Sequence, residues 1–208
     1  MESTTLRDRL ALLGLGQSTQ TGFPGEAEGR LPNTAVLGAM DRAALSFGYG
    51  LSVSVLQLAQ AYSVFANDGV LQPVTLLSEG LTPRPTRIFQ SETVRAMLPM
   101  LEAVTESGGT ATQARIPLYR VGGKTGTTMK LISGSYASQQ YVSSFVGLAP
   151  MSKPRFVMAV VIDDPRSQQY FGGQVAAPVF ADVMDDVMRI YDVVPDQVST
   201  PVLAQGVR

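Results

Sequence analysis

The sequence predicts an α+β fold in which an antiparallel sheet is flanked by helices. The first observation is a block of three β-branched or aromatic runs, separated by Gly, Ser and Pro, which predicts three strands: "LYRVGGKTGTTMKLI", "YVSSFVGLAP" and "RFVMAVVIDDP". The second is the short connection "APMSKP", which is typical of a hairpin between the last two strands. The third is that segments with helical spacing of apolar residues lie on both sides of this block, which places helices around one sheet.

Three helices are expected before the strands. The first runs from Thr5 to about Leu15 and is stopped by glycines. The second lies in "SFGYGLSVSVLQLAQAYSVFANDG", where "NDG" provides the stop. The third lies in "QSETVRAMLPMLEAVTESGG", with Ser91 as candidate cap and a kink expected at Pro99. Between the first two helices lie about forty residues rich in Gly and Pro, including "TGFPGEAEGRLP". They indicate an ordered surface excursion, because "FPGE" has Pro and Gly at the two central turn positions.

A last helix is expected from about Ala176 to Asp192. Its apolar spacing predicts that five side chains face the core: Val179, Phe180, Val183, Val187 and Ile190. Residues 193–208 are expected to form a flexible tail, so the folded part is expected to cover residues 1–192.

Composition excludes several kinds of chemistry. With 208 residues, 45% of them hydrophobic, the chain can bury a sizeable core as one domain or at most two. The net charge of −1 gives no basic field for nucleic acid or an anionic membrane, so neither is expected as a partner. The sequence has no His and no Cys, which excludes a Ser-His-Asp triad, thiol catalysis, metal-thiolate sites and most zinc sites. No metal and no cofactor are therefore expected, and acid–base chemistry must use Lys, Tyr or a carboxylate.

The segment "YRVGGKTGTTMK", Tyr119 to Lys130, could end a phosphate-binding loop or form a catalytic strand. A Walker A loop reads G-x-x-x-x-G-K-[ST], because an early glycine lets the backbone turn around the phosphates before a helix begins. Here Leu118 occupies the position of the first glycine, and "TTMKLISGSY" does not continue as a helix. The strand interpretation is favoured, and a nucleotide-binding protein is kept as an alternative that titration with labelled nucleotide would detect.

The tripeptide K-T-G, at residues 124–126, belongs to a three-part signature with S-x-x-K and S-D-N in penicillin-binding proteins and class A β-lactamases. Its surroundings, "GGTATQARIPLYRVGGKTGTT", are similar to the approach to this strand in class B penicillin-binding proteins. "FPGE", "SFGYGLSVSVLQLAQAY", "VGLAP" and "YFGGQVAAPVF" resemble further segments of that family in the same order, over nearly all of residues 5–192. The chain thus resembles the cell-division class B type, penicillin-binding protein 3, a peptidoglycan D,D-transpeptidase.

This resemblance implies a penicillin-binding protein or serine β-lactamase-like transpeptidase fold, with defined roles on the K-T-G strand. Lys124 would supply a positive charge and join a proton-transfer network. The hydroxyls of Thr125 and Thr127 would donate to a carboxylate of the substrate or of a β-lactam, and the backbone N–H of Thr127 would be one oxyanion donor. Gly126 would leave room for a substrate backbone along the strand edge.

Three aromatic residues, Tyr141, Tyr170 and Phe171, align with aromatic residues that line the substrate cleft in similar proteins. The alternative for them is ordinary strand and turn packing. A fourth position, Met129, is often basic in the division enzymes, so one polar contact near the site is expected to be missing.

The nucleophilic serine of the family is not found in the sequence. The lysines at 124, 130 and 153 are preceded three residues earlier by Val121, Thr127 and Pro150, and no S-x-N is present. The resemblance therefore covers the C-terminal half of a transpeptidase domain, and the chain is expected to be inactive alone. A non-enzymatic module of the same origin, which binds a peptide or a partner, is the alternative.

For a complete parent protein, the resemblance implies four kinds of partner: the peptidoglycan stem peptide, β-lactams, the missing N-terminal half, and division proteins. It also implies a place at the septum, on the periplasmic face of the bacterial inner membrane. The chain itself shows no signal or anchor, because "MESTTLRDRL" has no apolar stretch behind its charges and no run approaches the roughly 20 apolar residues that span a bilayer.

Overall fold

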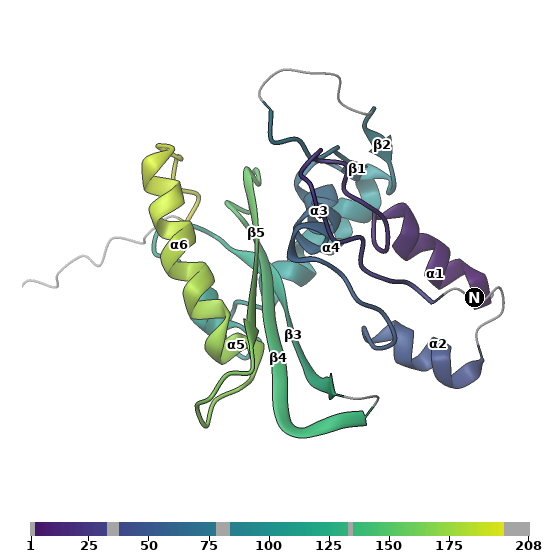
Figure 1. Ribbon diagram of the computed structural model, residues 1–208. Coiled ribbons are helices and arrows are strands. Elements are labelled where there is room, and N and C mark those ends of the chain that lie inside the picture. The colour runs from purple at the N-terminus through teal and green to yellow at the C-terminus, as the bar shows by residue number, and fades with distance from the viewer. Residues whose placement is uncertain (1–2, 33–37, 78–83, 133–134, 198–208) are drawn as a thin grey trace, which may run out of the picture.

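The three expected strands form one antiparallel sheet in the order β3-β4-β5. The structure is a computed structural model that describes residues 3–32, 38–77, 84–132 and 135–197 (Figure 1). The strands are β3 (Gly122–Ile132), β4 (Ser135–Ala149) and β5 (Phe156–Asp163). The expected hairpin joins β4 to β5, so both the antiparallel sheet and the hairpin are confirmed.

Strand β3 begins three residues later than the sequence indicated. Tyr119 makes an isolated bridge with Ile116 instead of joining β3, and Leu118 before it has a φ of 72°. Further along, Thr125 faces Phe145 on β4, and no helix begins there. The phosphate-loop alternative requires such a helix and is therefore wrong.

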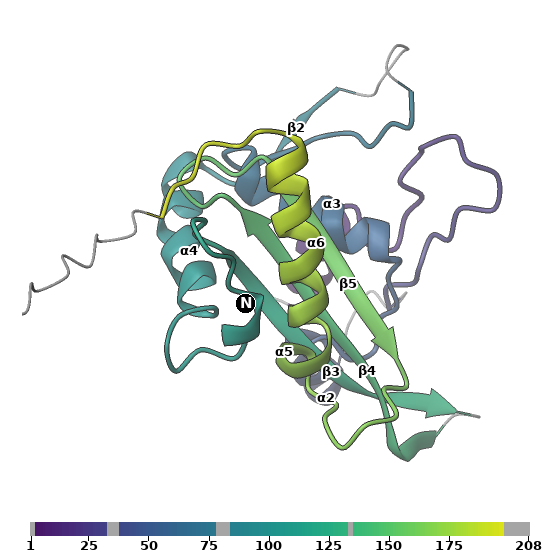
Figure 2. The ribbon, with the colours of Figure 1, turned by 90° about the vertical axis from the view of Figure 1, so that its left-hand side faces the viewer.

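Helices cover both faces of the sheet, as the predicted fold class requires. On one face lie the short helix α5 (Gly172–Val175) and the long helix α6 (Ala177–Ile190), and Figure 2 shows α6 crossing in front of the strands. On the other face lie α3 (Val55–Ala66) and α4 (Ser91–Ala103). Each face has its own buried cluster, with Phe145 and Phe180 at the centre of the first and Leu148 in the second.

The remaining elements are short. They are helix α1 (Ser3–Leu12), helix α2 (Ala39–Ser46), the 3-10 turn η1 (Thr112–Ala114), and a two-stranded antiparallel pair of β1 (Val70–Leu71) with β2 (Thr86–Arg87). Helix α2 was not expected, because it lies within the Gly- and Pro-rich excursion. Within the described residues, no helix is both long and apolar enough to cross a bilayer.

Helix α6 buries a stripe of side chains that overlaps only partly with the expected one, since Phe180 and Val187 pack toward the core as predicted. Phe180 is fully buried, with its ring edge-to-face against Phe145 at 5.0 Å. Val179, Val183 and Ile190 are wrong as core residues, since they are 41%, 44% and 77% exposed. The other residues buried on this helix are Ala177, Met184 and Met188. The helix carries two apolar stripes that share Phe180, and the contact with the sheet selects the stripe that continues through Met184 and Met188.

The starts of α3 and α4 differ in their capping. Ser54 caps α3 in a capping box with Gln57, whose side chain is fully buried. The Gln57 amide also donates to the carbonyl oxygens of Gln17 at 2.5 Å and Glu28 at 2.7 Å, which fastens the excursion to α3. Ser91 is not the cap of α4, as had been expected: Gln90 holds that position and the Ser91 hydroxyl bonds the carboxylate of Asp68 instead.

A single carboxylate organises the "FPGE" turn of the excursion. Glu26 accepts hydrogen bonds from the hydroxyls of Ser18, Thr19 and Thr21 and from the backbone N–H of Gln20. These bonds, the one from Ser18 first, lower the pKa of Glu26 from 4.5 to about 2. The excursion is thus an ordered loop, as the sequence indicated.

The first residues of the expected tail pack against the start of β3. Val193 is buried, and its carbonyl oxygen accepts a hydrogen bond of 2.7 Å from the Tyr119 hydroxyl. The carboxylate of Asp196 accepts from the backbone N–H of Arg120 at 2.7 Å and of Ser152 at 2.8 Å. Residues 198–208, the rest of that tail, lie outside the described residues.

Candidate active site on strand β3

Strand β3 carries the K-T-G residues at one edge of the sheet. It pairs with β4 on one side, and on the other side no described strand joins it. An open strand edge presents backbone N–H and C=O groups that an extended peptide can use. The strand therefore offers Lys124, Thr125, Gly126 and Thr127 beside an unpaired edge.

The two threonine side chains lie on the α5 face of the sheet. The Thr125 hydroxyl is 3.0 Å from the Thr110 hydroxyl, and the Thr127 hydroxyl accepts a hydrogen bond of 3.1 Å from the backbone N–H of Gly172. Because the Thr127 oxygen accepts this bond, its own proton is free to be donated to another group. The Lys124 ammonium, in turn, donates to the carbonyl oxygen of Thr125 at 2.9 Å.

The turn that starts α5 fits directly onto the strand backbones. A Cβ atom on Gly172 would lie 2.2 Å from the carbonyl oxygen of Ser144 and 2.6 Å from that of Gly126. A Cβ atom on Gly173 would lie 1.9 Å from the carbonyl oxygen of Thr110. These contacts are too short for any side chain, so both glycines are needed for α5 to hold the Thr110 loop and β3 together.

The three predicted aromatic residues form one cluster beside this turn. The rings of Tyr141 and Tyr170 are stacked with centroids 4.1 Å apart, and the Phe171 ring is 4.5 Å from that of Tyr170. The hydroxyl of Ser143, opposite Thr127 on β4, donates to the carbonyl oxygen of Tyr170. Burial, followed by the neighbouring Tyr170, raises the pKa of the Tyr141 hydroxyl. The cluster is thus continuous with the K-T-G strand through Phe171 and Gly172.

The structure brings all seven predicted site residues into one region, and their roles stay predictions. Sequence reasoning missed Thr110 and Gly172, which position the two threonine hydroxyls. Thr110 stood in "GGTATQ", a segment that carried the resemblance without a role for its threonine. Met129, at which a polar contact was expected to be missing, is half-exposed and pairs with Tyr141 across the sheet.

The arrangement can bind an anion but does not include an activated nucleophile. The two hydroxyls suit a carboxylate, and the Lys124 ammonium, which donates to the Thr125 carbonyl oxygen, adds a positive charge to the same strand. No serine of the chain has a lysine three residues later, the spacing that the family signature requires. Among residues 3–32, 38–77, 84–132 and 135–197, no group of His, Cys, Asp and Glu side chains is placed to hold a metal ion.

The family described as "Penicillin binding protein transpeptidase domain" matches residues 1–185. The chain therefore belongs to the transpeptidase domains of penicillin-binding proteins. Its relatives place it within class B, as the sequence motifs indicated.

Three relatives illustrate this similarity. The chain is 40% identical over 196 residues to the probable peptidoglycan D,D-transpeptidase PenA of Neisseria meningitidis serogroup A, covering 94% of this chain and 33% of that protein. It is 42% identical over 189 residues to the probable D,D-transpeptidase PbpC of Pseudomonas aeruginosa, covering 91% and 34%. It is 37% identical over 200 residues to the D,D-transpeptidase FtsI of Escherichia coli K12, covering 96% and 34%.

Two solved structures are similar over most of the chain. The apo transpeptidase domain of Burkholderia pseudomallei penicillin-binding protein 3 superposes with a TM-score of 0.88 at 42% identity, covering 95% of this chain and 60% of that one. A Burkholderia ambifaria protein described as a peptidoglycan glycosyltransferase gives 0.82 at 41% identity, covering 96% and 60%. The chain spans about a third of the length of the curated relatives it matches.

Proposed function

We propose that this chain is the K-T-G half of a peptidoglycan D,D-transpeptidase that cross-links the cell wall through a serine acyl-enzyme. The family membership and the D,D-transpeptidase relatives support the reaction. The similarity of its motifs to the cell-division type supports a role at the septum, on the periplasmic side of the inner membrane.

The open edge of β3 is the observation that carries the proposal. A stem peptide can lie along this edge with its terminal carboxylate at the hydroxyls of Thr125 and Thr127. Lys124 adds positive charge beside them, and the ordinary penicillins carry a carboxylate that these groups would bind in the same way. Removal of one hydroxyl donor to a charged group costs about 1.5–3 kcal/mol, so each threonine matters for acylation.

The nucleophile of the proposed reaction comes from outside residues 1–208. An activated serine requires a base one helical turn away, and no S-x-x-K is present in this chain. The K-T-G residues stabilise a transition state that exists only when the serine is supplied. We therefore expect no covalent labelling of the lone chain by penicillin.

Acylation by a fluorescent penicillin tests the proposal. The lone chain should remain unlabelled, and labelling should appear when an upstream half that bears S-x-x-K and S-x-N is joined to it. In the completed domain, Thr125→Val should slow acylation by about tenfold or more, the equivalent of one lost bond to a charged group. Lys124→Ala should slow it as strongly.

Matched variants separate these roles from general damage. Thr125→Ser keeps the hydroxyl, and Lys153→Ala removes an exposed lysine in the β4–β5 connection, so both should acylate nearly as fast as the parent. Stoichiometric acylation of the lone chain at one of its own residues would contradict the proposed origin of the nucleophile. Reversible peptide binding by a completed, folded domain that is never acylated would favour the non-enzymatic module.

A further inference from the structure

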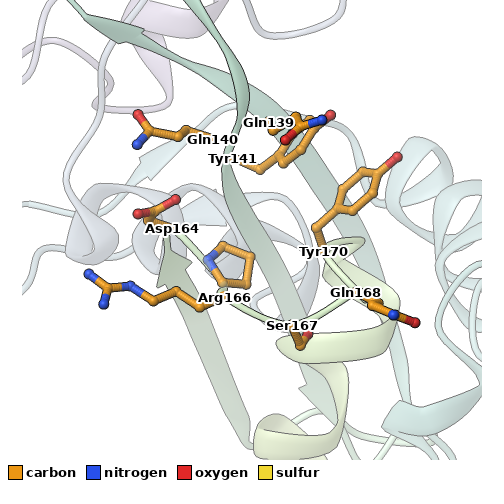
Figure 3. Close-up of a pocket in the computed structure, with 9 residues that line it drawn as sticks. Gln139, Gln140, Tyr141, Asp164, Arg166, Ser167, Gln168 and Tyr170 are labelled. Carbon is orange, nitrogen blue, oxygen red and sulfur yellow. The ribbon is translucent and has the colours of Figure 1, made fainter.

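A pocket lies beside the aromatic cluster of Tyr141, Tyr170 and Phe171. It has a volume of about 820 Å³, within the range of pockets that hold small ligands. Its walls come from the start of β4 and from the loop that joins β5 to α5 (Figure 3). Tyr141 and Tyr170 form the wall that it shares with the aromatic cluster.

The pocket is lined by polar groups of both charges. In the view of Figure 3, the polar ends of Gln140, Asp164 and Arg166 extend to one side, and Tyr170 and Gln168 extend to the other. Arg166 has no hydrogen bond or ion pair within the described part of the chain. The Asp164 carboxylate likewise accepts no hydrogen bond from a described residue, although it contributes to the raised pKa of Lys130.

The nearest lysine is already engaged elsewhere. Lys130 forms its ion pair with Asp163 at 2.8 Å, and this bond is the main cause of its raised pKa. The backbone of Asp164 is held in place, since its N–H donates to the Tyr141 carbonyl oxygen at 2.9 Å while its φ is 55°. The pocket therefore presents a carboxylate and a guanidinium, two residues apart, that do not bond each other.

We propose that this pocket binds a zwitterionic amino-acid group, one that carries an ammonium and a carboxylate on the same carbon. Asp164 would bind the ammonium and Arg166 the carboxylate, and the Gln140 amide can serve either group. A ligand of one charge would leave one of the two protein charges without a partner, so a zwitterion is the better match.

The position of the pocket connects it to the proposed substrate. Tyr170 is followed by Phe171 and Gly172, and the Gly172 N–H bonds the hydroxyl of Thr127, so one wall of the pocket leads to β3. The charged groups of the pocket lie after the end of β5, on the other side of β4 in the sheet. Identifying the ligand as part of a cell-wall peptide rests on the proposed function. The zwitterion could belong to the peptide that acylates the enzyme or to the one that accepts the acyl group. The chemistry of the pocket is the same for both.

Titration of the chain with free alanine tests the pocket without any need for acylation. The side-chain amide signals of the pocket glutamines in ¹⁵N-resolved NMR spectra should shift with alanine. They should shift far less with propionate, which lacks the ammonium, or with ethylamine, which lacks the carboxylate. Asp164→Asn and Arg166→Gln should each weaken alanine binding by about three- to tenfold, the effect of one partly exposed charge-assisted contact. Arg95→Gln, on the exposed side of α4, should leave it unchanged.

Equal shifts with alanine, propionate and ethylamine would overturn the inference. Alanine binding that is unchanged in both Asp164→Asn and Arg166→Gln would also overturn it. Failure of alanine binding would not bear on the proposed function, because penicillin labelling of the completed domain tests that function separately. In that domain, slower acylation by a stem peptide in the Asp164→Asn and Arg166→Gln variants assigns the pocket to the acylating peptide. Slower transfer to an amine with unchanged acylation assigns it to the accepting peptide. No change in either reaction would show that the pocket does not serve the substrate.

Discussion

Replacing Gly172 with alanine tests how the candidate site is held together. The new Cβ atom would lie 2.2 Å from the carbonyl oxygen of Ser144 and 2.6 Å from that of Gly126, and both neighbours are backbone atoms that cannot rotate away. The start of α5 must therefore move outward by about 1 Å to restore ordinary contact distances. Overpacking of this kind costs about 1–3 kcal/mol.

The expected effect is measurable by thermal unfolding. In a chain of this size, 1–3 kcal/mol corresponds to a fall in Tm of about 2–12 °C. The same displacement lengthens the bond from the Gly172 N–H to the Thr127 hydroxyl, so hydrogen exchange at residue 172 should accelerate. Gly172 does not have a positive φ, so the experiment tests the contact and not the conformational freedom of glycine.

Gly38→Ala is the matched control. Gly38 has a φ of −61°, and among the described residues an added Cβ would meet only the movable carboxylate of Asp41 at 3.3 Å. Its Tm should change much less than that of Gly172→Ala. A Gly172→Ala variant with an unchanged Tm and unchanged exchange at residue 172 would refute the close packing of α5 on the strand backbones.

Three further predictions concern stability. Phe180→Ala removes a fully buried ring that packs against Phe145, so it should lower the free energy of unfolding in urea by about 3–5 kcal/mol. A much smaller decrease would mean that this core is not formed. The pKa of Glu26 is about 2 in the folded chain and 4.5 ordinarily, so its contribution to stability is present above about pH 4.5 and is lost as the pH falls toward 2. The urea midpoint of Glu26→Gln should therefore depend less on pH between 4.5 and 2 than that of the parent chain. An unchanged pH profile in the variant would contradict this. The lone chain should bind a hydrophobic dye, because Met100 on α4 is 61% exposed and Val55 on α3 is 47% exposed. Joining the upstream half should reduce this binding. A lone chain that binds no dye would contradict the prediction.

The strands and helix α3 could be predicted from the sequence because their signals are local. Alternation and β-branching mark β4 and β5, and apolar spacing with a Gly stop marks α3. Helix α2 was missed because its short apolar pattern lies among glycines and prolines. The face of α6 was misjudged because two stripes were apolar, and only contact with Phe145 on the sheet distinguishes them.

The K-T-G residues and Thr127 could be found from the sequence because they are consecutive in the chain and the resemblance assigned their roles. The residues that position the two threonine hydroxyls could not be found in this way. Thr110 and Gly172 reach Thr125 and Thr127 from 15 and 45 residues away, and no spacing rule connects those positions. The pocket at Asp164 and Arg166 is likewise created by the packing of a loop against β4. In the sequence, these two charged residues are typical of an ordinary surface turn and do not indicate a pocket.

The two buried clusters have a consequence for the order in which the molecule assembles. In the part of the chain that the structure describes, the cluster under α6 and the groups that bond the Thr125 and Thr127 hydroxyls all come from residues 104–193. The cluster on the opposite face instead needs Tyr62 and Phe65 from α3, far earlier in the chain. Local contacts form faster than distant ones, so the unit of β3, β4, β5 and α6 can close first and α3 can dock onto it afterwards. Opening of α3 would then leave the hydroxyl pair of the candidate site in place, as a separate cooperative unit.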